Sequence, residues 1–201
     1  MPAAALAVAK RELRARILAS PVPRGDAARA AGLVAAAALL DAPEFRQARR
    51  VALFASLGDE PPTRPLFETL RLKGVGILMP RVVPDDRLEF LPVRHWAALR
   101  PGPLGVLEPP SGAVQELSFG DVVVVPGLAF DRRGGRLGRG KGYYDRSFPS
   151  GLGGPRLIGY AWACRIVAEV PMGPHDRRID ALVTEFGAMR FERRMEGHDG
   201  I

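Results

Sequence analysis

Four consecutive valines, Val122–Val125, constrain the fold of this chain more than any other feature. A strand that is apolar on both faces is typical of the centre of a parallel sheet covered by helices. Strand-like and helical segments alternate from residue 50 onward, after two helical segments at the start of the chain. We expect helices over residues 3–19, 26–40, 64–73 and 141–147, and strands over residues 51–55, 75–79, 88–92, 122–125, 157–160 and 181–184.

This pattern predicts an α/β fold, in the form of a layered αβα domain with a mostly parallel central sheet and N-terminal helices. We expect a single domain over residues 1–190 and a polar C-terminal tail over residues 191–201 that frays. The segment 101–110 is too rich in proline and glycine to form a regular element. A chain of 201 residues is long enough to bury a substantial core.

A basic segment rich in glycine, residues 126–145, begins where the valine strand ends. Its glycines at positions 134, 135, 138, 140 and 142 allow backbone N–H groups to converge on an anion, and its arginines and lysine neutralise the charge. The carboxylate at its end, Asp145, is suited to hold Mg²⁺ beside that anion. The segment therefore predicts a phosphate site with a metal at its edge, most simply an ATP site. The alternative is a mobile loop with solvated arginines.

The spacing Gly135-x-x-x-x-Gly140-Lys141 matches most of a P-loop, but Gly142 stands where that loop needs a Ser or Thr hydroxyl on the metal. An ordinary P-loop NTPase is therefore disfavoured. The chain also lacks the Gly-x-Gly-x-x-Gly pattern, so a dinucleotide fingerprint is not supported.

The net charge of +7 is compatible with nucleic acid, an anionic membrane or a phosphorylated small molecule as partner. Because the arginines are scattered except over residues 132–141, a phosphate-bearing small molecule is favoured over nucleic acid.

The single cysteine, Cys164, excludes an intramolecular disulfide and a Cys-based zinc cluster. The longest apolar run, residues 33–40, is too short to cross a bilayer, and the first nine residues lack the basic region of a signal peptide. We expect a cytoplasmic monomer that binds neither nucleic acid nor membrane.

Residues 126–145 closely resemble the signature of the 5-formyltetrahydrofolate cyclo-ligases, also called methenyltetrahydrofolate synthetases. Four shorter matches follow in the family's order and spread over nearly the whole chain: Lys10-x-x-Leu13-Arg14, Phe54-x-Ser-x-x-Asp-Glu60, Gly105-Val-Leu-Glu108-Pro109, and His175-Asp176-x-x-x-Asp180 with Thr184-Glu185. The resemblance implies that ATP and Mg²⁺ drive closure of 5-formyltetrahydrofolate to 5,10-methenyltetrahydrofolate, with release of ADP and phosphate. The formyl oxygen would be phosphorylated, and N10 of the folate would then attack the activated carbon.

The resemblance also implies roles for individual residues. Arg139 and Lys141 would be catalytic, since they would stabilise charge during phosphoryl transfer. The implied ATP-binding set consists of Lys10, Arg14, Arg136, Gly138, Arg139, Gly140, Lys141, Gly142, Tyr143 and Tyr144.

Asp145 and Asp176 match the family's magnesium-binding aspartates, although a helix cap or a surface ion pair is an alternative for Asp176. Glu60 matches the family's folate-binding glutamate. Phe54, Tyr143 and Tyr144 would supply the walls for a flat pterin, with a place in the core as the alternative for each.

Three other functions stay open at the level of the sequence. A nucleotide- or folate-binding paralogue without turnover would need only part of the charged set. A basic nucleic-acid-binding module would show a steep salt dependence of binding. A sugar-phosphate isomerase on a similar sheet would work without ATP.

Overall fold

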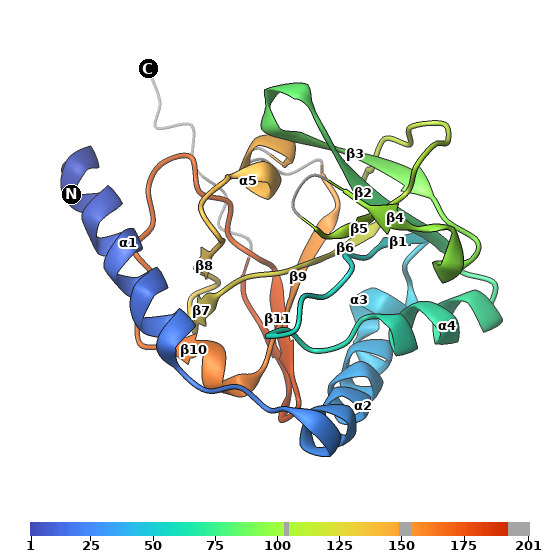
Figure 1. Ribbon diagram of the computed structural model, residues 1–201, viewed down its shortest axis with the longest axis horizontal. Helices are drawn as coiled ribbons and strands as arrows, with labels where there is room; N and C mark the ends of the chain where they lie inside the picture. Colours follow the sequence, from blue (N-terminus) through green and yellow to red (C-terminus); the bar gives the residue numbers. More distant parts are fainter. Residues whose placement is uncertain (103–104, 149–153, 193–201) are drawn as a thin grey trace.

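The computed structural model describes residues 1–102, 105–148 and 154–192 (Figure 1). Within these residues, seven strands form the central sheet in the order β12-β11-β9-β6-β1-β2-β3. Their bounds are β1 (Arg50–Ala52), β2 (Gly76–Val83), β3 (Arg87–Pro92), β6 (Val122–Val125), β9 (Arg156–Tyr160), β11 (Ala181–Thr184) and β12 (Gly187–Arg190). The inner strands pair in parallel, and each edge strand pairs antiparallel with its neighbour. The predicted α/β class and mostly parallel sheet are confirmed.

The valine strand β6 lies in the middle of this sheet, between β1 and β9. Each of its side chains is at most 1% exposed. Val122 and Val124 face one hydrophobic cluster, while Val123 and Val125 face the other. Both faces of the sheet are therefore covered, as four apolar residues in a row predict.

Helices cover one face of the sheet. They are α2 (Gly25–Asp41), α3 (Pro43–Arg46) and α4 (Arg64–Leu72), which Figure 1 shows grouped together. Leu39 from α2 and Phe67 from α4 are fully buried in the cluster on this face. The opposite face is covered in part by the short helix α5 (Tyr143–Ser147) and by Phe148, which packs against Phe90 of β3.

The first helix, α1 (Ala3–Ala19), packs on a second, smaller sheet. That sheet has the order β10-β7-β8, with bounds β7 (Ala129–Asp131), β8 (Arg136–Leu137) and β10 (Ile166–Val167). Leu13 and Ile17 of α1 form a buried cluster with Leu128 and Leu137. Because β7 and β8 belong to the glycine-rich segment, this packing places α1 beside that segment (Figure 1).

Several predicted boundaries were wrong. The strand expected over residues 51–55 ends at Ala52, whereas the strand expected over residues 75–79 continues through Pro80 to Val83. The extension of β2 has a physical reason: beyond Leu78, β2 pairs only with β3, and a proline without an N–H group is tolerated where one side of a strand is unpaired. The helix expected from residue 141 begins at Tyr143, after Gly142 with a φ of +67°.

The segment 101–110, expected to be irregular, contains part of a short hairpin formed by β4 (Arg100–Pro101) and β5 (Leu107–Glu108). Three single 3₁₀ turns complete the described elements: η1 (Pro84–Asp86), η2 (Trp96–Ala98) and η3 (Ala163–Arg165). Of the expected polar tail, Phe191 donates a backbone hydrogen bond to Asp180 and packs on the core. Residues 193–201 lie outside the described part of the chain.

Candidate active site

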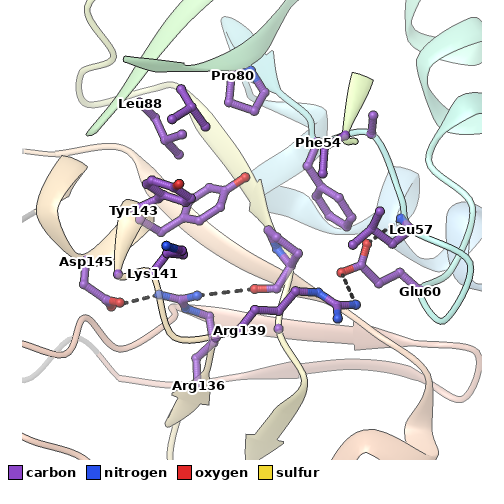
Figure 2. Close-up of a pocket in the computed structure, with 18 of the residues that line it drawn as sticks. Phe54, Leu57, Glu60, Pro80, Leu88, Arg136, Arg139, Lys141, Tyr143 and Asp145 are labelled. Carbon is purple, nitrogen blue, oxygen red and sulfur yellow. Dashed lines mark hydrogen bonds and ion pairs between the residues drawn. The ribbon is translucent and has the colours of Figure 1, made fainter. Parts of the chain in front are cut away.

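A cavity lies beyond the carboxyl ends of β1 and β6 (Figure 2). Phe54 and Ala55 reach it from the end of β1, and Pro126 and Gly127 from the end of β6. This is where ligands collect in open parallel sheets. Its other lining residues are Leu57, Glu60, Pro80, Val82, Leu88, Val106, Glu108, Arg136, Gly138, Arg139, Lys141, Gly142, Tyr143, Tyr144 and Asp145.

The cavity has an apolar end and a charged end. Phe54, Pro80 and Leu88 contribute to the apolar end, and Figure 2 shows Pro80 and Leu88 on the opposite side of the cavity from Arg136 and Arg139. The enclosed volume is about 150 Å³, below the roughly 300–1,000 Å³ of a pocket that surrounds a whole drug-sized ligand. The cavity therefore suits one flat ring system, with the rest of a longer ligand extending outward. Phe54 is only 4% exposed and also belongs to the core cluster, so it is both core and wall.

Glu60 is a nearly buried carboxylate in this cavity, with a side chain that is 9% exposed. The backbone N–H of Leu57 donates to its Oε2 at 2.8 Å, and Arg139 Nη2 lies 3.6 Å from its Oε1. Burial raises the pKa of Glu60 to about 7, and the Leu57 donor and the Arg139 charge oppose that rise. Glu60 therefore changes charge close to neutral pH, and it can accept a hydrogen bond from a donor-bearing ring edge when it is ionised.

Asp131 organises the turn between β7 and β8 in the glycine-rich segment. It is 1% exposed, and it accepts hydrogen bonds from the backbone N–H groups of Arg133 (2.8 Å), Gly135 (2.9 Å) and Val170 (2.9 Å). A Cβ atom at Gly135 would collide with the Asp131 carboxylate, so the turn requires a glycine at that position. The turn returns the chain to the cavity through Arg136 and Leu137 of β8.

Arg136 is held on several sides. Its Nη2 donates to Asp145 Oδ1 at 2.8 Å, and its Nη1 donates to the Pro126 carbonyl at 3.4 Å (Figure 2). The guanidinium lies 5.6 Å from the centroid of the Tyr144 ring, a cation–π contact. Its side chain is 4% exposed, so in this arrangement Arg136 fixes Asp145 and Tyr144. Its predicted contact with ATP stays a prediction.

Of the two predicted magnesium ligands, Asp145 lies in α5 and Asp176 lies in the loop between β10 and β11. Asp145 Oδ1 accepts from Arg136 and from the backbone N–H of Arg177, which directly follows Asp176. Asp176 Oδ2 accepts from Lys10 and from the backbone N–H of Gly173. Within the described residues, the second oxygen of each carboxylate has no hydrogen-bond partner. Each carboxylate therefore keeps an oxygen of the kind that Mg²⁺ takes as a ligand, together with phosphate and water oxygens.

Lys10 and Arg14 approach the site from α1. Lys10 pairs with Asp176, and Arg14 Nε donates to the Gly138 carbonyl at 3.0 Å. Neither side chain lines the cavity. Together they join α1 to the two loops that carry the glycine-rich segment and Asp176.

Arg139 and Lys141 occupy the mouth of the cavity. Arg139 extends towards Glu60 (Figure 2) and also pairs with Asp59. Lys141 is exposed and, within the described residues, its ammonium forms no ion pair. Gly140, with a φ of +109°, turns the backbone between these two cations.

The structure thus brings most of the predicted site residues into one cavity, and it leaves four beside it. Those four are Lys10, Arg14, Gly140 and Asp176. Their roles, and those of the residues inside the cavity, stay predictions.

Sequence reasoning did not assign a role to three carboxylates of this region: Asp59, Glu108 and Asp131. Glu108 lines the cavity, and burial raises the pKa of its carboxyl. Two of them, Asp59 and Glu108, lie inside the short matches quoted above, and Asp131 lies inside the glycine-rich segment. These positions within the motifs could have identified the three carboxylates as site residues. Their roles could not be predicted, because the contacts that define them come from distant parts of the chain.

Comparison with known proteins gives consistent results. Residues 7–185 match the family model described as the 5-formyltetrahydrofolate cyclo-ligase family. The chain is 34% identical over 143 residues to the 5-formyltetrahydrofolate cyclo-ligase of Mycolicibacterium smegmatis, covering 68% of this chain and 73% of that protein. It is 34% identical over 158 residues to the Escherichia coli K12 protein of the same name, covering 76% and 87%.

Two solved structures share the fold. The NMR structure of Aquifex aeolicus 5,10-methenyltetrahydrofolate synthetase matches with a TM-score of 0.78 and 30% identity, covering 94% of this chain and 97% of that chain. A 5,10-methenyltetrahydrofolate synthetase from Mycoplasma pneumoniae matches with a TM-score of 0.67 and 18% identity, covering 90% and 98%. Separately, no helix in the described part of the chain has both the length and the apolar character needed to span a membrane.

Proposed function

The chain belongs to the 5-formyltetrahydrofolate cyclo-ligase family, a family of enzymes, and we propose that it closes 5-formyltetrahydrofolate to 5,10-methenyltetrahydrofolate with ATP and Mg²⁺. One observation carries the proposal: a cavity with an apolar end and a nearly buried carboxylate, Glu60, also contains the cations Arg139 and Lys141. A flat ring and a phosphate chain can therefore meet at the same point.

The chemical obstacle is the formamide, because its oxygen is a poor leaving group. In the proposed reaction an O–P bond forms between the formyl oxygen and the γ-phosphorus, while the bond between that phosphorus and ADP breaks. N10 then attacks the formyl carbon, the C–O bond to the phosphoryl group breaks, and N10 loses its proton. The products are the methenyl ring, ADP and phosphate.

This reaction asks the protein mainly for alignment and charge neutralisation. The apolar end of the cavity, at Phe54 and Leu88, would hold the pterin and exclude water. Glu60 would accept N–H groups of its donor-bearing edge. Arg139 and Lys141 would stabilise negative charge on the transferring phosphoryl group, since both reach the mouth where the two substrates meet.

Asp145 and Asp176 would hold magnesium through their free oxygens, and a bound ion would neutralise charge on the triphosphate. Arg136 keeps Asp145 in place, and Lys10 keeps Asp176 in place. The chain would therefore present both carboxylates before the nucleotide arrives.

The direct test mixes the full-length protein with 5-formyltetrahydrofolate, ATP and Mg²⁺ and follows the near-ultraviolet absorbance of the methenyl product. We expect product formation that stops when ATP or Mg²⁺ is omitted. Binding of folate and ATP without product would instead identify a non-catalytic paralogue. Product formation that does not depend on ATP would contradict the proposed phosphorylation.

A further inference from the structure

Arg139 is a catalytic candidate whose side chain is not held in place by contacts within the glycine-rich segment. It lies on a loop between Gly138 and Gly140, and its side chain is 40% exposed. A long side chain in such a position has many rotamers, and holding it in one geometry requires contacts from outside the loop.

Those contacts come from the loop after β1. Arg139 Nη2 donates to Asp59 Oδ1 at 2.5 Å, whereas Glu60 Oε1 is farther away, at 3.6 Å from the same nitrogen. Asp59 is therefore the main partner of Arg139. Within the described residues, the Nε and Nη1 atoms of Arg139 donate to no group, so they stay available to an anion at the cavity mouth.

Asp59 is itself held from its other side. Its Oδ2 lies 3.6 Å from Nη2 of Arg165, whose side chain is only 4% exposed. Arg165 Nη1 donates to the carbonyl of Ile17 in the last turn of α1. A buried arginine, anchored to a helix end, thus fixes the carboxylate that fixes Arg139.

We propose that Asp59 is a positioning residue that holds Arg139 across the cavity mouth, with one guanidinium nitrogen anchored and the others directed to the transferring phosphoryl group. This inference rests on the proposed function, because it assigns Arg139 to phosphoryl transfer. Asp59 lies between the guanidinium groups of Arg139 and Arg165.

A purely structural ion pair would behave differently. A partly exposed pair contributes little to stability, and its loss would leave kcat unchanged. A positioning role predicts a loss of kcat, because a small misplacement of a group that contacts the reacting atoms slows the chemical step far more than it weakens substrate binding.

The test compares Asp59→Ala with Asp59→Glu in the full-length protein, using initial rates of methenyl formation. We expect Asp59→Ala to lower kcat roughly 10- to 100-fold with a much smaller change in either KM, and Asp59→Glu to restore part of the loss. Glu169→Ala is the matched control, because it removes an exposed partner of Arg133 in the same glycine-rich segment. The double variant Asp59→Ala/Arg139→Ala should be no slower than Arg139→Ala alone.

A normal kcat in Asp59→Ala, or losses that multiply in the double variant, would overturn the inference. A second measurement does not depend on turnover: the NMR order parameter of the Arg139 Nε–H group. We expect it to fall in Asp59→Ala and to stay unchanged in Glu169→Ala, and an unchanged value in both variants would overturn the inference. Wild-type protein that makes no methenyl product would overturn the proposed function instead, while this measurement still decides the role of Asp59.

Discussion

Glu60 illustrates how burial changes the chemistry of a single carboxyl group. Burial raises its pKa from an ordinary value of 4.5 to about 7. Because the folded-state pKa lies above the unfolded-state value, protonation of Glu60 favours the folded chain. Its contribution to stability is present below pH 4.5 and is lost as the pH rises through about 7.

Replacing Glu60 by Gln should remove this pH dependence. We expect the unfolding free energy of Glu60→Gln, measured by urea denaturation, to rise relative to wild type between pH 4.5 and pH 8, by up to about 3 kcal/mol. The reason is that the amide never carries the charge that burial disfavours. A difference between the two proteins that is constant over this range would contradict the assigned pKa.

Lys141 is the residue on which turnover should depend most. Lys141→Ala should lower kcat by about 100-fold or more, because it removes a cation from the transition state of phosphoryl transfer. The free energy of unfolding should change by less than about 0.5 kcal/mol, since the side chain is exposed and unpaired within the described residues. Methenyl absorbance and urea denaturation measure the two effects.

Lys73→Ala is the matched control for this experiment, because Lys73 is exposed at the end of α4 and does not line the cavity. It should retain wild-type turnover. Near-normal kcat in folded Lys141→Ala would argue strongly against the assignment of Lys141.

At the scale of elements, the turn between β7 and β8 depends on one buried carboxylate. Asp131→Ala would leave three backbone N–H groups without their acceptor. We expect a loss of about 2–4 kcal/mol in the free energy of unfolding, and a smaller loss in Asp131→Asn, which keeps an oxygen acceptor. Wild-type stability in Asp131→Ala would show that the turn does not rest on this residue.

Some elements could be predicted from the sequence to the residue, and the shortest could not be predicted at all. The helix over residues 3–19 has the predicted bounds because its residues are good helix formers without Gly or Pro, and the strands over residues 122–125 and 181–184 have the predicted bounds because each is a short run rich in β-branched or apolar residues. In contrast, β7, β8 and β10 have two or three residues each, too few for a recognisable period. They exist because distant segments pair with one another, as Phe130 does with Ile166.

The candidate site also contains residues that the sequence predicted and residues that it did not. The glycines and cations of residues 126–145 indicated a phosphate site, since spacing and residue type carry that information. Asp59 lies inside a quoted match, but its role could not be predicted because its partners Arg139 and Arg165 are distant in sequence. Their meeting depends on how the loop after β1, the glycine-rich segment and η3 fold together.

At the scale of the whole molecule, the two larger sheets have separate tasks. The central sheet ends in the cavity, whereas the small sheet supports the glycine-rich segment and carries α1 on its surface (Figure 1). Lys10 and Arg14 then connect α1 to the loops that hold Asp176 and Gly138. The fold therefore brings an apolar cavity and a set of cations together in one place.

In the proposed reaction, a phosphoryl group passes from ATP to the formyl oxygen in this cavity. The most direct measurement supplies 5-formyltetrahydrofolate labelled with oxygen-18 in its formyl group, together with unlabelled ATP and water, and determines the mass of the released phosphate. We expect each phosphate formed with product to carry one labelled oxygen. Release of unlabelled phosphate alongside methenyl product would contradict it.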